Sequence, residues 1–320
     1  LKSILILLSV IITFNPMTLQ AGETVRIGAL YPLSGGAAKS GTDTANAIRL
    51  AIEIVNNKQT GLTIPFANSK GLPALGNAKI DLIIADHQGS PEIGAAEAER
   101  LIVQKNVVAL IGAFHSSVAA TSSQVAERMG VPFISGESEA TSLTERGYKW
   151  FFRTTPSSKT QARDFFTFLQ DINKKNSARI KSIALVHENT LWGKGFAKSV
   201  KGYFKNFPEF QLAVDIIYQQ GTVDVTSEVQ RLLAVNPDVV FHASYDAEAI
   251  LFARTYKQYN FNPKGIMAIG AAFGSNAFRD ALGSDSDHFI VREHWSRDLS
   301  SRNIHVSQVG KLYRKKFGKD

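Results

Sequence analysis

The sequence predicts an α/β fold made of two doubly wound lobes, each a parallel sheet covered by helices. Short and almost entirely apolar segments recur along the chain, and segments with apolar residues at helical spacing lie between them. Strands that are apolar on both faces and bridged by helices are typical of parallel sheets buried on both sides. The alternation stops near Pro156 and then resumes, which indicates two sheets rather than one.

The first set of elements precedes that break. Apolar runs predict strands at Val25–Leu30, Ile80–Ala85, Val107–Ile111 and Val131–Ser135. The intervening helices are expected at Thr42–Asn57, from Ser90-Pro91 onward, and at Ser117–Met129. Proline suits the first position of a helix, because its missing N–H has no intrahelical partner there.

The second set follows the same pattern. Strands are predicted at Ser182–His187, Leu212–Tyr218, Val239–Ala243 and Gly265–Gly270. Helices are predicted at Gly193–Asn206, Val225–Val235 and Asp246–Tyr259. Repetition of one supersecondary unit in both halves is the strongest signal in the chain.

The N-terminus has the pattern of a secretory signal peptide, and we assign residues 1–22 to it. Lys2 precedes an apolar run from Ile4 to Phe14, and Ala21 follows shortly after. That run is shorter than the roughly 20 residues that span a bilayer. The alternative is a buried N-terminal strand or helix. The sequence has no cysteine, which excludes disulfides and a lipid-anchored cysteine. We therefore expect a periplasmic protein.

The chain has a formal net charge of +8, and the C-terminal stretch "KLYRKKFGKD" supplies several of the positive charges. Such a surplus is compatible with nucleic acid or anionic lipid as a partner. The alternative is a solvated helix face. Basic and aromatic residues are not interleaved, so we expect no nucleic-acid partner.

The loops after the strands carry the candidate site, since open parallel sheets bind ligands at the carboxyl ends of their strands. "GAFHSSVAAT" follows the third predicted strand, but it lacks the G-x-S-x-G turn of a serine hydrolase. The seven histidines show no metal-ligand spacing, and no glycine-rich loop continues as a P-loop. We therefore expect no catalytic residue, no metal and no cofactor.

Binding without chemistry remains, and Ser116 and Ser117 are its first candidates. They stand where a helix begins, so hydroxyls and free backbone N–H groups meet there and suit a carboxylate. We expect one serine to cap the helix and the other to face a cleft. "GESEAT", after the next strand, adds Ser138, while Glu137 and Glu139 offer negative charge for a ligand ammonium. The alternative is that these glutamates are solvated.

Two aromatic residues are the candidates from the second lobe. Trp192 lies between a strand and a glycine-containing helix start, and Tyr245 follows the end of another strand. We expect both rings to cover an organic ligand when the lobes close. The alternative is ordinary packing within the core or between lobes.

From about Val25 to about Trp295 the chain resembles the type I periplasmic binding proteins of branched-chain amino acid ABC transporters, the Leu/Ile/Val-binding group. The resemblance rests on six segments in order: "IGALYPLSG", "AAEAERLIVQKNVVALIGAFHSS", "GVPFIS", "LTERGYKWFFRTTP", "LWGKGFAKSV" and "NPDVVFHASYDAEA". It implies two lobes joined by hinge strands, which close on a small-molecule ligand and dock on a membrane permease. It also implies a monomer without enzymatic activity.

The resemblance assigns roles to individual positions. The serine that matches Ser116 holds the ligand carboxylate, and the loop that matches Glu137–Glu139 contributes a hydroxyl and backbone groups. Trp192 and Tyr245 match aromatic positions of the second lobe.

One position departs from the amino acid binders, which place an acid where this chain has Ala272. A buried ammonium without a partner is costly. Either Glu139 or Asp246 substitutes, or the ligand is no α-amino acid. In that second case Phe273 and Trp192 favour a carboxylate with an apolar or aromatic body, or a small amide or urea.

The resemblance also predicts the domain boundaries. Residues 23–155 plus 296–320 form lobe 1, and residues 156–295 form lobe 2. Family members continue past "KLYRKKFGKD", so we expect a truncated C-terminus.

We predict the solute-binding component of an ABC importer for a small amino-acid-like or other carboxylate ligand. The alternative is a sensor of the same fold for amides, urea or aromatic acids, not coupled to transport. A third hypothesis is a hydrolase that uses Ser116 or Ser138.

Overall fold

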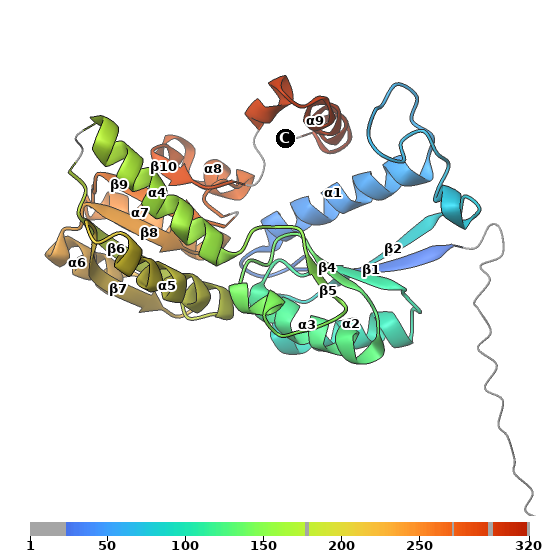
Figure 1. The fold of residues 1–320 in the computed structure, drawn as a ribbon, viewed down its shortest axis with the longest axis horizontal. Helices are drawn as coiled ribbons and strands as arrows, with labels where there is room; N and C mark the ends of the chain where they lie inside the picture. Colours follow the sequence, from blue (N-terminus) through green and yellow to red (C-terminus); the bar gives the residue numbers. More distant parts are fainter. Residues whose placement is uncertain (1–23, 177–178, 271, 294–296, 319–320) are drawn as a thin grey trace, which may run out of the picture.

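The computed structural model describes residues 24–176, 179–270, 272–293 and 297–318, arranged as two lobes side by side (Figure 1). The predicted signal peptide, residues 1–22, lies outside the described residues. Among the helices of the described ranges, none is both long and apolar enough to cross a bilayer.

The sheet of the first lobe has five parallel strands in the order β2-β1-β3-β4-β5. They are β1 (Val25–Tyr31), β2 (Ile80–Asp86), β3 (Ala109–Gly112), β4 (Phe133–Ser135) and β5 (Phe151–Arg153). Helices α2 (Pro91–Val103) and α3 (Ser116–Met129) cover one face, and α1 (Ala38–Asn56) lies over the other (Figure 1).

The sheet of the second lobe is also five-stranded and parallel, in the order β10-β9-β8-β6-β7. Its strands are β6 (Ser182–Glu188), β7 (Gln211–Tyr218), β8 (Val239–Ala243), β9 (Gly265–Ile269) and β10 (Phe289–Val291). Its helices are α4 (Ser158–Asn176), α5 (Leu191–Tyr203), α6 (Thr226–Val235), α7 (Asp246–Gln258) and α8 (Asn276–Leu282).

Alternate residues of the second sheet face opposite layers, because successive side chains of a strand point to opposite sides. On β6, Ile183 and Leu185 pack with α4 and α5, whereas Ala184 and Val186 pack with α6 and α7. The strand is therefore apolar on both faces, as predicted for a buried parallel sheet.

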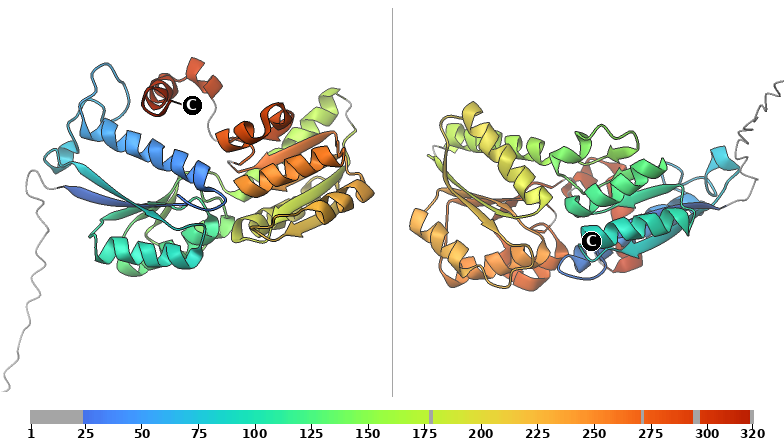
Figure 2. Two further views of the ribbon diagram at one scale, coloured as in Figure 1. Left: turned by 180° about the vertical axis from the view of Figure 1, so that it is seen from behind. Right: turned by 90° about the horizontal axis from the view of Figure 1, so that it is seen from below.

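The chain crosses from the first lobe to the second between β5 and α4, and it returns after β10. The last helix, α9 (Ile304–Phe317), lies over α1 (Figure 2). Its Tyr313 and Phe317 pack against Leu50 and Ile54 of α1. An ion pair between Lys316 and Glu53 adds to this contact.

The predicted fold class of two doubly wound lobes is confirmed, and the differences lie in individual elements. Strands β5 and β10 have three residues each, which is too short for a periodicity to be recognised. The predicted strand Val131–Ser135 begins only at Phe133. Helix α4 was not predicted either.

Candidate ligand site

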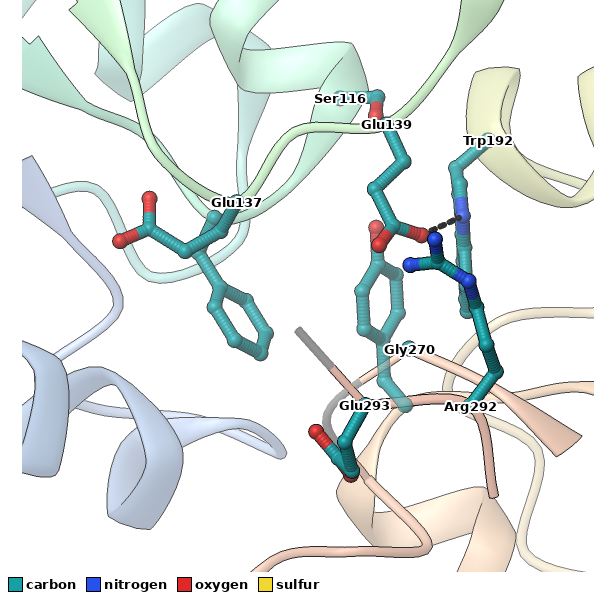
Figure 3. Close-up of a pocket in the computed structure, with 9 residues that line it drawn as sticks. Ser116, Glu137, Glu139, Trp192, Gly270, Arg292 and Glu293 are labelled. Carbon is teal, nitrogen blue, oxygen red and sulfur yellow. Dashed lines mark hydrogen bonds between the residues drawn. The ribbon is translucent and has the colours of Figure 1, made fainter. Parts of the chain in front are cut away.

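A cavity of about 80 Å³ lies between the lobes, at the carboxyl ends of strands from both sheets (Figure 3). Central strand β3 leads into it from the first lobe, and central strand β8 leads into it from the second. Nine residues line the cavity: Phe114, Ser116, Glu137, Glu139, Trp192, Tyr245, Gly270, Arg292 and Glu293. Four of the seven predicted ligand-binding residues are among them.

Ser116 is the first residue of α3 and is only 1% exposed. Its Oγ accepts a hydrogen bond of 3.1 Å from the backbone N–H of Ala140, and its own backbone N–H faces the Tyr245 phenol oxygen. Ser117 is half-buried and does not line the cavity. The predicted serine cap is wrong: His115 stands at the N-cap and makes no side-chain capping bond.

Ser138 and Glu139 follow β4 and have different surroundings. Ser138 is fully buried in the first lobe, where its Oγ donates to the Phe114 carbonyl over 3.3 Å. Ser138 is therefore not among the residues that line the cavity. Glu139 lines the cavity and is only 4% exposed.

The Glu139 carboxylate bonds to the second lobe. Its Oε2 accepts a hydrogen bond of 3.1 Å from Trp192 Nε1, and its Oε1 accepts one of 2.5 Å from Gln161 Nε2. Hydrogen bonds to a charged group are stronger than those between neutral partners. Glu139 therefore holds the lobes together at the centre of the cleft.

The two aromatic residues form the second-lobe wall. The ring centroids of Trp192 and Tyr245 are 5.0 Å apart at an interplanar angle of 32°. Gly270 has φ +82°, and a Cβ there would approach the Trp192 ring to 2.8 Å. Only glycine combines that backbone conformation with such a close approach, so Gly270 sets the position of the indole.

Phe273 and Ala272 belong to the core of the second lobe and not to the cavity. The Phe273 ring packs on His242, Phe278 and Phe289, with centroid distances of 4.9, 5.2 and 5.4 Å. Ala272 is buried in the same cluster. Phe273 is therefore not among the residues that line the cavity, because β10 and α8 cover this side chain.

Asp246, one of the two candidates for an ammonium partner, does not line the cavity either. It is buried at the first position of α7, where Ser40 of the first lobe and Ser275 face it. Burial raises the pKa of this carboxyl to about 6. Of the two acids proposed to take the role of the acid missing at position 272, Glu139 lines the cavity and Asp246 does not.

Sequence reasoning missed Phe114, Gly270, Arg292 and Glu293. Phe114 lies in the same loop as Ser116 and Ser117, and the prediction for that loop considered only its polar residues. Arg292 and Glu293 follow β10, which was not predicted, and no loop was expected there. Glu137, which was considered only for its charge, accepts hydrogen bonds of 3.2 Å from the Tyr31 hydroxyl.

The geometry around Ser116 does not fit a hydrolase. Its Oγ is engaged by a backbone N–H, and the adjacent His115 stacks on Tyr245 at 4.3 Å. Burial lowers the pKa of His115 to about 3, and its Nδ1 has no hydrogen-bond partner among the described residues. A serine nucleophile needs a base within hydrogen-bond reach, which this arrangement does not supply.

Comparisons with known proteins agree with this arrangement. Residues 24–320 match the family model described as "Periplasmic binding protein". The Leu/Ile/Val-binding protein homolog 7 of Brucella abortus (strain 2308) is 27% identical over 326 residues, covering 96% of this chain and 76% of the relative.

Two solved structures share the fold. The leucine binding protein LivK from Thermotoga maritima MSB8 has a TM-score of 0.77 at 20% identity, covering 93% of this chain and 77% of that one. A solute binding protein of an R. palustris ABC transporter, solved in complex with benzoate, has a TM-score of 0.76 at 19% identity, covering 92% and 74%. Ligands of two chemical classes are thus found on this fold.

Proposed function

Because the chain belongs to the periplasmic binding protein family, in its branched-chain amino acid group, we propose that it is the solute-binding component of an ABC importer. In this proposal it takes a small amino-acid-like or other carboxylate solute between its lobes in the periplasm. It then delivers the solute to a permease of the inner membrane.

The observation that carries the proposal is the composition of the cavity. Its walls come from both lobes, and the bond from Trp192 to Glu139 joins them. If the lobes moved apart, the two halves of the cavity wall would separate. When the lobes close, the two halves would meet again around a solute. Such closure is the usual way in which two-lobed binding proteins enclose a ligand.

The seat for a carboxylate is the N-terminus of α3. Its first turn contains no acidic residue, so the positive end of the helix dipole is not neutralised locally. Ser116 adds a backbone N–H and a hydroxyl. The Tyr245 hydroxyl now faces that N–H, and a solute carboxylate would replace it.

The small size of the cavity requires that a solute displace the Tyr245 side chain. Its volume of about 80 Å³ is smaller than that of common ligand pockets, which measure roughly 300–1,000 Å³. A solute therefore enters the open form, and the lobes close over it with Tyr245 displaced.

Equilibrium binding of a compound panel tests the proposal. We expect an amino acid, aromatic acid, amide or urea to change the tryptophan fluorescence, because Trp192 lies in the cavity, and to raise the melting temperature. Silence of both signals across the whole panel would refute a solute-binding role.

A pair of alanine variants locates the carboxylate seat. Ser116→Ala removes a buried polar partner and should weaken carboxylate binding by roughly 1–3 kcal/mol. Ser142→Ala changes an exposed serine away from the cavity and serves as the matched control, with unchanged affinity. Equal affinities for the two variants would place the carboxylate elsewhere.

Transport is tested in cells. Deleting the gene should abolish high-affinity uptake of the radiolabelled solute identified by the panel, and restoring the gene should recover it. Unchanged uptake would favour the sensor alternative over an importer.

A further inference from the structure

The charge of the cavity lining is unbalanced. Three carboxylates line it, from Glu137, Glu139 and Glu293, and the one lining cation is Arg292. Arg153 is the other arginine near Glu139, but its guanidinium bonds to the Ala140 carbonyl over 2.8 Å and does not line the cavity. Without Arg292, all charged side chains of the lining would be negative.

Arg292 reaches into the centre of this lining from the end of β10. Figure 3 shows its guanidinium turned toward the Glu139 carboxylate and beside the indole of Trp192. The group thus lies between an anion and an aromatic wall. That combination is typical of sites that bind organic cations, because carboxylates and ring faces both attract positive charge.

Arg292 has an anionic partner at the edge of the cleft. Its Nε is 3.4 Å from the carboxylate of Asp164 on α4, which is partly exposed. The side chain therefore keeps an anion to pair with when a ligand cation takes the place of its guanidinium beside Glu139.

We propose that the space bounded by Glu139, Trp192 and Tyr245 is a cation site, and that the Arg292 guanidinium is its internal occupant. A ligand ammonium or guanidinium displaces this group, and Arg292 then turns to Asp164. The inference rests on the proposed function and names its ligand class: an organic cation or a zwitterion. Glu139 thus supplies the negative charge that the chain lacks at Ala272.

A solute that carries only a carboxylate fits this lining poorly. It would place a fourth negative charge among Glu137, Glu139 and Glu293, in a site where burial strengthens repulsion. A zwitterion avoids this cost, since its cation pairs with Glu139 while its carboxylate lies at Ser116.

The test compares matched probes by isothermal titration calorimetry on the wild-type chain. L-norvaline and pentanoate differ by an α-ammonium, agmatine lacks the carboxylate, and benzoate lacks the cation. We expect L-norvaline and agmatine to bind at least roughly tenfold more tightly than pentanoate and benzoate, which corresponds to about 1.4 kcal/mol.

Two variants and a control then identify the residues. Glu139→Gln should weaken agmatine binding at least roughly tenfold and reduce the difference between L-norvaline and pentanoate. Arg292→Gln should tighten agmatine binding, because no internal cation competes. Glu145→Gln, an exposed glutamate outside the lining, should change nothing. Thermal melting shows whether each variant is folded.

The outcomes separate the two proposals. Preferential binding of benzoate or of neutral solutes, with Glu139→Gln as tight as wild type, would overturn the cation site and leave the solute-binding function standing. No binding of any probe, nor of any compound in the wider panel, would overturn both. The wild-type comparison decides the question even where a variant does not fold.

Discussion

The corner between β3 and α3 and the corner between β8 and α7 are equivalent places in the two lobes, yet their chemistry differs. Each strand is central in its sheet, and each leads into a helix whose N-cap is an aromatic ring, His115 or Tyr245. Neither ring makes a side-chain capping bond, and their centroids lie 4.3 Å apart across the cleft.

The difference lies in the first turn of each helix. That of α3 contains no acid, whereas that of α7 contains Asp246 and Glu248. Carboxylates there neutralise the positive end of a helix dipole. Of these two corners, only that of the first lobe therefore offers a seat for a ligand anion, while the second lobe contributes rings and Arg292. Identical topology places both corners at the cleft, and single side chains decide what each can bind.

The largest loss of stability is expected when buried side chains of the two central strands are replaced by alanine. Phe241 on β8 is fully buried, with ring contacts to Phe165 and Phe166 at 5.1 and 5.4 Å, and Leu110 on β3 is fully buried too. Phe241→Ala should cost about 3–5 kcal/mol of unfolding free energy, and Leu110→Ala about 2–5 kcal/mol. Urea unfolding measures both. Val223→Ala, at a residue 90% exposed, is the control; an equal cost for all three would show that the strands are not packed as described.

Acid should lower the free energy of unfolding through His115. Its pKa is about 3 when it is buried against Tyr245 and His87, and it returns toward 6.5 in a solvated state. The solvated state then binds more protons, so stability is lost as the pH falls from about 6.5 toward 3. We expect a loss on the order of a few kcal/mol, and His115→Phe should reduce it.

Urea titrations across this pH range measure that difference. His87→Phe serves for comparison: burial lowers the pKa of His87 only to about 4, so this variant should reduce the acid loss by less. A pH profile that His115→Phe leaves unaltered would show that the folded protein does not bury this imidazole.

Asp246 in the other corner should act with the opposite sign. Its pKa is about 6 in the structure and near 3.8 when solvated, so the folded form binds more protons between these values. Stability therefore falls as the pH rises from about 4 to 6 and stays low above. Asp246→Asn should stabilise the protein at pH 7 by on the order of 2 kcal/mol and have little effect at pH 4. Thermal melting at both pH values checks this, and equal shifts would contradict it.

The smallest effect is expected at the edge of the cleft, where Lys39 of α1 pairs with Asp280 of α8. Both side chains are substantially exposed, so the pair contributes at most about 1 kcal/mol to closure. Lys39→Ala should weaken solute binding less than threefold, an effect that 0.5 M salt removes. A larger loss of affinity in the binding assay would mean that this pair controls closure.

The repeated pattern was enough to predict the architecture. Apolar runs buried on both faces, bridged by helices, predicted two parallel sheets, and six short segments predicted the family; both predictions are confirmed. These features depend on local periodicity and on the order of segments, which a sequence displays directly. The proposed lobe boundaries and the signal peptide stay predictions.

The candidate site was only partly predictable. Ser116, Glu139, Trp192 and Tyr245 follow strong strands, and the rule that ligands lie at strand ends located them. Ser138 and Phe273 follow strands as well, but the direction of a loop side chain depends on neighbours distant in the chain. Arg292 follows a strand of three residues, which no periodicity reveals.

The sequence alone thus determined the two sheets and the loops that meet at their edges, because hydrophobic burial imposes a pattern that can be read residue by residue. The tertiary structure decided which loop side chains enter the cleft. It turned Ser138 and Phe273 into their lobes, brought Arg292 beside Glu139, and set Tyr245 over the N-terminus of α3. The first two positions result from packing within each lobe and the last two from the docking of one lobe on the other. No local pattern encodes either kind of contact.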